Sequence, residues 1–243
     1  MSFAVKSGDV SWGLRLRRVA RHVGLEVSRY RPAGARRNLL LAKHGIETVL
    51  DVGANQGQYG VELRQFGYSG RIVSFEPLSE AFEALYATAG ADPSWECHRV
   101  ALGDSDTTSE IGVASNLASS SFLPMLDAHH DAAPGVSMTG SETVEIRTLD
   151  SMDLELTGPT LLKLDVQGYE DRVLRGAQAL LADVKLIECE VSLEPLYESQ
   201  LTFLPMLDLL RESGFELLRL EPGIRDQGGR GAIVQYDAIA ARA

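Results

Sequence analysis

A glycine-containing stretch, Asp51-Val52-Gly53-Ala54-Asn55-Gln56-Gly57, has the residue types of a ligand-binding loop. Gly53 permits a tight turn and a close approach by a ligand, because it has no Cβ. N–H groups at the start of a helix after Gly57 can bind a carboxylate or a phosphate. The carboxylate of Asp51, two positions before Gly53, would repel a pyrophosphate and attract an ammonium group. We therefore expect a ligand with a positive charge near this loop.

The glycine spacing excludes two common nucleotide-binding motifs. Gly53 and Gly57 form a G-x-x-x-G pattern, whereas a dinucleotide fingerprint requires G-x-G-x-x-G. The sequence also lacks the Gly-Lys-Ser/Thr of a P-loop. Taken alone, the two glycines are equally compatible with a structural turn.

Two further strand ends carry residues that suit a nucleoside. Glu76 follows the run 71–75, where a carboxylate can accept hydrogen bonds from both ribose hydroxyls, although a surface acid is the alternative. The segment 101–104 offers a small apolar surface and an acid, which suit an adenine ring and its amine. An ammonium, a ribose and an adenine together describe S-adenosylmethionine. The predicted cofactor residues are Asp51, Gly53, Ala54, Asn55, Gly57, Tyr59, Glu76, Pro77, Ala101, Leu102, Gly103, Asp104 and Asp165.

Asp165 and Glu190 are the candidate catalytic residues for methyl transfer to an alcohol. An alcohol has a high pKa, so a base or a metal is expected to help remove its proton. Asp165 ends the run 160–166, at the edge where doubly wound sheets bind ligands; a helix N-cap is its alternative role. Glu188 and Glu190 share one face of the next strand, and Lys163 could neutralise one of them. Asp165 with Glu190 could also bind a divalent ion, a possibility that we do not adopt.

Residues 105–143 form a long insert that is rich in Ser, Ala and Pro and has weak periodicity. Inserts of this kind are usually functional or mobile, so we interpret it as a lid or substrate loop with short strands near 108–114 and 143–148. A histidine there could act as a base, with a solvated loop histidine as the alternative. The predicted substrate-binding residues are Ser121, His129, His130, Gln167, Tyr169 and Glu170.

Short apolar runs that alternate with helical patterns predict an α/β fold with a doubly wound, mainly parallel sheet. The Gly-rich connection 221–232 predicts that the sheet ends in an antiparallel pair. The expected strands are 47–52, 71–75, 96–101, 160–166, 184–191, 215–220 and 232–240, and the expected helices are 57–67, 78–89, 170–182 and 200–213.

The motifs "DVGANQGQYG", "SFEP", "VALGD" and "LLKLDVQGYEDRVLRGA" resemble those of the FkbM-type S-adenosylmethionine-dependent methyltransferases, over roughly residues 46–240. The family pattern Lys-x-Asp-x-Glu-Gly-x-Glu reads Lys163, Asp165, Gln167, Gly168, Glu170 here, so Gln167 departs from the usual Glu. The resemblance implies the class I methyltransferase (Rossmann-like) fold, with a seven-stranded sheet and an antiparallel last strand. It also implies O-methylation of a sugar hydroxyl or a natural-product alcohol.

The N-terminal segment 1–45 differs in charge from the methyltransferase domain expected over 46–243. Residues 1–37 hold nine Lys and Arg against two acids, whereas the chain of 243 residues has a net charge of −11. The acidic remainder makes nucleic acid an unsuitable partner. The segment 11–27 predicts a basic amphipathic helix, which either packs on the domain or contacts the inner membrane surface.

Cys97 and Cys189 are the two cysteines, which predicts a reducing, cytoplasmic location without a disulfide framework. No Cys/His cluster indicates a metal site, and no apolar run is long enough for a membrane span. We expect an O-methyltransferase for a small polar acceptor. A methyltransferase acting on protein or another non-sugar acceptor, and a non-catalytic binding module on the same fold, are the alternatives.

Overall fold

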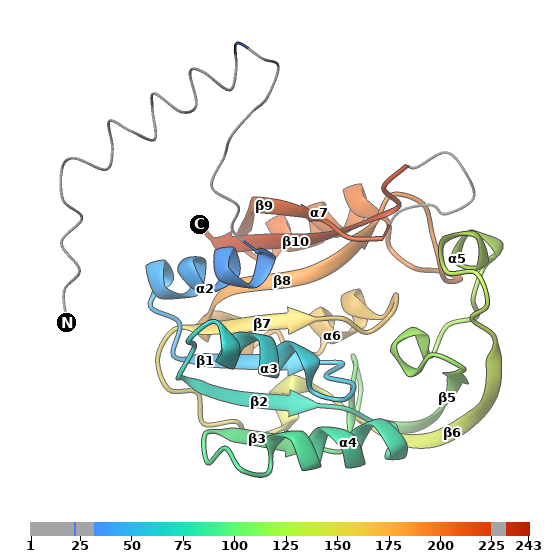
Figure 1. Ribbon diagram of the computed structural model, residues 1–243, viewed down its shortest axis with the longest axis horizontal. Helices are drawn as coiled ribbons and strands as arrows, with labels where there is room; N and C mark the ends of the chain where they lie inside the picture. The colour runs from blue at the N-terminus through green and yellow to red at the C-terminus, as the bar shows by residue number, and fades with distance from the viewer. Residues whose placement is uncertain (1–21, 23–31, 225–231) are drawn as a thin grey trace.

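The computed structural model describes residues 22, 32–224 and 232–243. A seven-stranded sheet forms its centre, in the order β3-β2-β1-β7-β8-β10-β9 (Figure 1). The six strands other than β10 run parallel, and β10 pairs antiparallel with β8 and β9. The strands are β1 (Thr48–Val52), β2 (Arg71–Phe75), β3 (Trp95–His98), β7 (Thr160–Leu164), β8 (Val184–Ser192), β9 (Phe215–Pro222) and β10 (Gln235–Arg242).

This arrangement confirms the predicted doubly wound sheet with an antiparallel last strand. β10, the last strand in the chain, lies one place in from the edge, and β9 forms the edge itself. All five residues of β7 are buried, as expected for a central strand covered on both faces. Because β1, β2 and β7 run parallel, the residues that follow them meet at one edge of the sheet.

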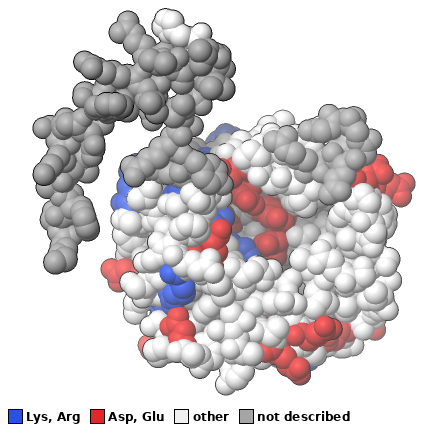
Figure 2. All heavy atoms as spheres, viewed as in Figure 1, with Lys and Arg blue, Asp and Glu red and all other residues white. Residues whose placement is uncertain are grey.

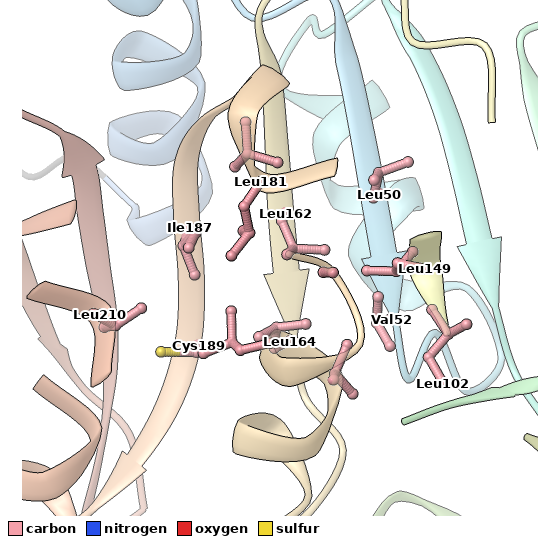
Figure 3. Packing of buried hydrophobic residues seen from close by; sticks show 14 of the residues in the cluster. Leu50, Val52, Leu102, Leu149, Leu162, Leu164, Leu181, Ile187, Cys189 and Leu210 are labelled. Carbon is pink, nitrogen blue, oxygen red and sulfur yellow. The ribbon is translucent and has the colours of Figure 1, made fainter. Parts of the chain in front are cut away.

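Helices cover both faces of the sheet. Leu41, Leu63 and Leu85 come from α2 (Ala33–His44), α3 (Gln58–Gln65) and α4 (Ser79–Ala89) and pack on one face. The opposite face packs against α6 (Glu170–Arg175) and α7 (Phe203–Glu212), and against the single turns η2 (Leu149–Ser151) and η3 (Leu180–Asp183) (Figure 3). Each large apolar side chain buried in these layers contributes about 1.5–3 kcal/mol relative to exposure. The burial anchors the strand ends on which the candidate site is built.

The insert contains regular structure beyond the carboxyl ends of the parallel strands (Figure 1). A second sheet has the order β4-β6-β5 and consists of β4 (Ala101–Leu102), β5 (Thr107–Ala114) and β6 (Met138–Arg147). The turn η1 (Leu117–Ser119) and the helix α5 (Asp127–Ala132) lie between β5 and β6 in the chain. Ile111, Val144 and Ile146 bury a small core with Leu78 and Ala81, which holds this sheet against the start of α4.

Three elements differ from the sequence expectation. The expected helix 170–182 ends at Arg175, with Gly176 as its C-cap, where a Cβ would lie 1.9 Å from the carbonyl oxygen of Gly103. The expected strand 96–101 divides into β3 and β4, which belong to different sheets. The helix α2 lies in the segment 1–45, which we expected to be helical, but no helix was predicted with these bounds; its Leu40 and Leu41 pack on the sheet.

The amphipathic helix predicted over 11–27 lies outside the described residues, apart from His22. The described part of the connection 221–232 ends at Ile224 and resumes at Ala232. None of the helices within the described residues is long and apolar enough to cross a membrane.

Candidate active site

A pocket of about 630 Å³ opens at the carboxyl ends of β1, β2 and β7. We call it the strand-end pocket. The insert covers it with apolar side chains of Ile111, Leu117 and Phe122. Of the predicted site residues, the wall includes Gly53, Asn55, Glu76, Pro77, Ala101, Leu102, Asp165, Gln167 and Tyr169.

The loop after β1 approaches the end of β7 at backbone distance. Gly53 has a φ of 74°, and a Cβ built on it would lie 1.9 Å from the carbonyl oxygen of Asp165. Any side chain at position 53 would therefore push the two strand ends apart. The N–H groups of Gly53 and Ala54 each donate to the carbonyl oxygen of Phe75 at 3.0 Å. Gly57, with a φ of 88°, then begins α3 at the predicted position.

Glu76 lies on the pocket wall directly after β2 and is 6% exposed. Its two carboxylate oxygens accept the N–H groups of Asn55 and Leu78, both at 2.9 Å. Burial raises the pKa of Glu76 to about 7, and these two hydrogen bonds limit the rise. Each carboxylate oxygen keeps a further lone pair for a hydroxyl donor. Such an arrangement fits a ribose whose two hydroxyls donate to one acid.

The far end of the strand-end pocket is apolar and aromatic. Ala101 and Leu102 line it beside Tyr169, whose ring lies 5.0 Å from that of Phe122. Asp104 is exposed, is not part of this wall, and lies 3.7 Å from the guanidinium of Arg172. The apolar surface suits an adenine ring. The carboxylate of Asp104, which we expected beside the adenine amine, lies beside Arg172 instead.

Asp51 lies beneath the glycine loop and is fully buried. Lys163 Nζ lies 3.0 Å from its Oδ1 and 3.4 Å from Asp165 Oδ2. Burial would lower the pKa of Lys163, but the charges of Asp51 and Asp165 raise it above its usual value. Asp51 is thus neutralised by an internal lysine. The direct attraction of an ammonium that its sequence position suggests is therefore weakened.

Asp165, Gln167 and Glu190 meet at the ends of β7 and β8. The Gln167 side-chain amide donates to Asp165 Oδ1 at 2.8 Å and to Glu190 Oε2 at 3.0 Å. Gln235 donates a second hydrogen bond to Glu190 Oε2 at 3.0 Å. Burial, followed by the charge of Asp165, raises the pKa of Glu190 well above its usual range. The protonated form of Glu190 is therefore favoured more than that of an exposed glutamic acid.

Glu188 has a different partner from the one that we expected. Arg37 on α2 forms a two-pronged ion pair with it, donating from Nε at 2.9 Å and from NH2 at 2.7 Å to Glu188 Oε1. Tyr59 donates to Glu188 Oε2 at 2.9 Å. Burial alone would lower the pKa of Arg37, but Glu188 raises it. Lys163 forms its ion pairs with Asp51 and Asp165, and the charge of Glu190 acts on it only as a smaller contribution.

A second cavity of about 640 Å³ shares Gly53, Gln58 and Asp165 with the first. Its remaining wall consists of Ala54, Tyr59, Glu62 and Lys163, so we call it the charged pocket. Figure 2 shows acidic atoms gathered around a hollow near the middle of the visible face, with basic atoms between them. Among the described residues, no three His, Cys, Asp or Glu side chains converge in a group that could hold a metal ion.

The candidate residues of the insert are not brought together on a pocket wall. His129 is 3% exposed and packs edge-on against Tyr197, at 5.2 Å between ring centres, and burial lowers its pKa. His130 is exposed. Ser121 is buried and donates to the Gln167 carbonyl oxygen at 2.7 Å, whereas its neighbour Ser120 reaches the strand-end pocket.

The segment after β7 also decides between two roles considered for Asp165. The helix α6 begins at Glu170 with Tyr169 in the N-cap position, so Asp165 is not its cap. Glu170 lies buried below the turn and accepts the N–H groups of Val166 at 3.1 Å and Gly168 at 3.2 Å. Burial raises the pKa of Glu170 to about 7. Glu170 therefore shapes the turn from beneath, away from the pocket.

Several wall residues were missed from the sequence. Phe75 and Val166 lie inside the quoted motifs, directly beside predicted residues, and could have been found by including those neighbours. Leu117, Ala118 and Phe122 come from the insert, where no periodic pattern marks them. Other wall residues that were not predicted are Val52, Gln58, Leu78, Val100, Ile111 and Ser120.

Comparison with solved structures finds methyltransferases among those with similar folds. Magnesium protoporphyrin IX methyltransferase from Synechocystis PCC 6803 with bound S-adenosylmethionine has a TM-score of 0.47 at 11% identity, covering 100% of this chain and 87% of that one. TehB from Haemophilus influenzae has a TM-score of 0.48 at 10% identity, covering 89% of this chain and 64% of that one.

Comparison with characterised sequences and family models is more informative. The 2-O-methyltransferase NoeI of Sinorhizobium fredii (strain NBRC 101917 / NGR234) is 29% identical over 182 residues, which are 72% of this chain and 74% of that protein. The model of the methyltransferase FkbM domain matches residues 51–217, from the end of β1 into β9. The resemblance in the motifs is thereby confirmed: this chain belongs to the FkbM family and is an S-adenosylmethionine-dependent methyltransferase with the class I fold.

Proposed function

We propose that the protein transfers a methyl group from S-adenosylmethionine to a hydroxyl of a small polar acceptor, most simply a sugar or glycoside. The observation that carries the proposal is that the strand-end pocket and the charged pocket meet at Asp165. A group bound in the first pocket would face a group bound in the second across one carboxylate. The 2-O-methyltransferase name of the relative supports an oxygen acceptor.

The strand-end pocket fits the cofactor by shape and chemistry. Glu76 would accept the ribose hydroxyls, and Ala101 and Leu102 would pack against the adenine. The backbone approach at Gly53 leaves room for the methionine portion beside Asp165. When bound, S-adenosylmethionine supplies a methyl group on a positively charged sulfur, which keeps the electron pair of the breaking C–S bond as the new C–O bond forms.

Asp165 has the position for a base. The proton of the acceptor hydroxyl would pass to its carboxylate, which lies on both pocket walls. Burial and the charge of Asp165 raise the pKa of Glu190, so the protonated form of Glu190 is favoured beside the proposed base. Lys163 Nζ lies 3.4 Å from Asp165 Oδ2 and places a positive charge beside it.

The charged pocket favours an acceptor with several hydroxyls. Glu62, Lys163 and Asp165 offer both donors and acceptors on one wall, and Tyr59 adds an aromatic ring. Sugars present alternating hydroxyls and apolar C–H faces, which match such a mixed surface.

A methyl-transfer screen tests the proposal. Purified protein would be incubated with S-adenosylmethionine labelled in the methyl group and with panels of monosaccharides, disaccharides, alcohols, amines and peptides. We expect label in an alkali-stable ether of at least one sugar. Transfer only to nitrogen or carboxyl groups, or absence of calorimetric cofactor binding, would overturn the proposal.

A further inference from the structure

Gln167 lies in a backbone conformation that side chains rarely adopt. Its φ is 53°, and the following Gly168 has a φ of 95°. A non-glycine residue in this region is strained, so surrounding contacts must hold it there. Glu170 supplies two of them through the N–H groups of Val166 and Gly168 on either side. The turn therefore fixes where the Gln167 side chain points.

Both polar groups of the Gln167 side-chain amide have a partner in this structure. The amide nitrogen donates to Asp165 at 2.8 Å and to Glu190 at 3.0 Å. The amide oxygen accepts from the Tyr197 hydroxyl at 2.8 Å. A carboxylate in this place would offer acceptors to acceptors, and an apolar side chain would leave both carboxylates without this donor.

Gln167 also connects the insert to the Asp165–Glu190 pair. Its carbonyl oxygen accepts the Ser121 hydroxyl at 2.7 Å. The Tyr197 hydroxyl that holds its amide oxygen also lies 3.2 Å from the carbonyl oxygen of Ser119. Ser119 and Ser121 flank Ser120, which lines the strand-end pocket. Gln167 is thus hydrogen-bonded both to the carboxylates of Asp165 and Glu190 and to the part of the insert that covers the strand-end pocket.

We propose that Gln167 is a positioning residue that sets the geometry of the Asp165–Glu190 pair and couples the two carboxyl groups to the insert. The proposal rests on the function above, in which Asp165 takes the acceptor proton. A side chain that adds a third carboxylate, or that removes the two donors, will make ionisation of the pair harder. The charged and titratable groups that face the pair are Lys163 on β7, Asp51 on β1, Glu188 on β8, Asp237 on β10, Glu170 on α6, Arg37 on α2 and Tyr197.

Carboxyl ¹³C NMR on protein labelled at Asp and Glu tests this without any acceptor. In Gln167→Glu, the titration midpoint of the pair should rise by about one unit or more relative to wild type. Gln167→Asn shortens the reach but adds no charge, so its midpoint should rise less. The control Gln178→Glu makes the same chemical change at an exposed position after the end of α6 and should leave the midpoint unchanged. Unchanged midpoints in both folded Gln167 variants would overturn the proposal.

Kinetics with an acceptor from the screen provide the second measurement. We expect Gln167→Glu to lower kcat on the order of 10- to 100-fold with little change in KM, because the base is displaced rather than the acceptor site. The acidic limb of its pH–rate profile should shift upward by the amount seen in the NMR titration. A fall in kcat without a shift in the acidic limb of the pH–rate profile would indicate that Gln167 has a merely structural role. If the screen finds no methylated hydroxyl, the proposed function fails, but the NMR result still decides the role of Gln167.

Discussion

The strand-end pocket and the charged pocket share a wall at Asp165, but different kinds of chemical groups form them. Backbone turns and apolar side chains form the first, and its acid, Glu76, is held by two backbone N–H groups. Long-range ion pairs surround the second, such as that of Arg37 with Glu188, 151 residues apart. In the proposed assignment, backbone geometry at the strand ends accounts for cofactor binding, whereas the acceptor side depends on the packing of side chains distant in the chain.

The largest effect should come from the residue that both pockets share. Asp165→Asn removes the proposed base while keeping the size of the side chain, so kcat should fall on the order of 10²- to 10⁴-fold. The dissociation constant of S-adenosylmethionine, measured by calorimetry, should change only a few-fold. The exposed Asp104 serves as control, and Asp104→Asn should keep the wild-type rate. If kcat and cofactor affinity fell by equal factors, Asp165 would act only in cofactor binding. The distinction drawn between the two pockets would then fail.

Substitutions around the charged pocket should change the free energy of unfolding most. Arg37→Met leaves Glu188 buried without its cation, so the free energy of unfolding should fall by about 3–5 kcal/mol in urea titrations. Arg211→Met removes an exposed pair with Asp208 and should cost no more than about 1 kcal/mol. If the two variants lose equal stability, Glu188 is less dependent on Arg37 than the contacts indicate.

The glycine loop should be sensitive to a single methyl group. Gly53→Ala introduces a Cβ 1.9 Å from the Asp165 carbonyl oxygen at a positive φ, so we expect a loss of about 1–3 kcal/mol in cofactor binding, in stability, or divided between the two. Gly140→Ala in the insert meets no atom within 4 Å and should leave both unchanged. Calorimetry and thermal unfolding measure the two quantities, and an unaffected Gly53→Ala would contradict the backbone account of this pocket.

The smallest predicted effect is a pH dependence from Glu76. Ribose hydroxyls donate to its ionised form, so cofactor affinity should fall by up to about tenfold between pH 8 and pH 6 as this acid, with a pKa of about 7, takes up a proton. Glu76→Gln should flatten the profile. The wild-type affinity staying constant over this range would show that Glu76 does not receive the ribose.

The same acid should act on stability with the opposite sign. Its pKa is higher in the folded protein than the ordinary value of 4.5, so its favourable contribution is complete below pH 4.5 and is lost as pH rises through about 7. Glu170, with a pKa of about 7, acts in the same direction. The melting temperature of the free protein should therefore be lower at pH 8 than at pH 5.5, while cofactor affinity is higher.

The parts predictable from the sequence were those with a local signature. Gly53, Glu76 and Asp165 each end a strand, and parallel pairing alone brings strand ends together. Arg37, Tyr197 and Phe122 could not be assigned because their partners lie far away in the chain and no spacing rule connects them. For Asp51, the sequence pattern fits a ligand contact but gives no sign that Lys163 lies 3.0 Å away.

The reversed direction of β10 has a practical consequence for handling the protein. Gln235 at its start lies opposite Ser192 at the carboxyl end of β8, and Ala241 lies opposite Leu186 near the other end. Ala243 therefore leaves the sheet on the side away from both pockets, as the mark C in Figure 1 indicates. An affinity tag or a sensor surface attached after this residue would leave the route of acceptor and cofactor open, which makes it the preferred anchor for surface-based binding measurements.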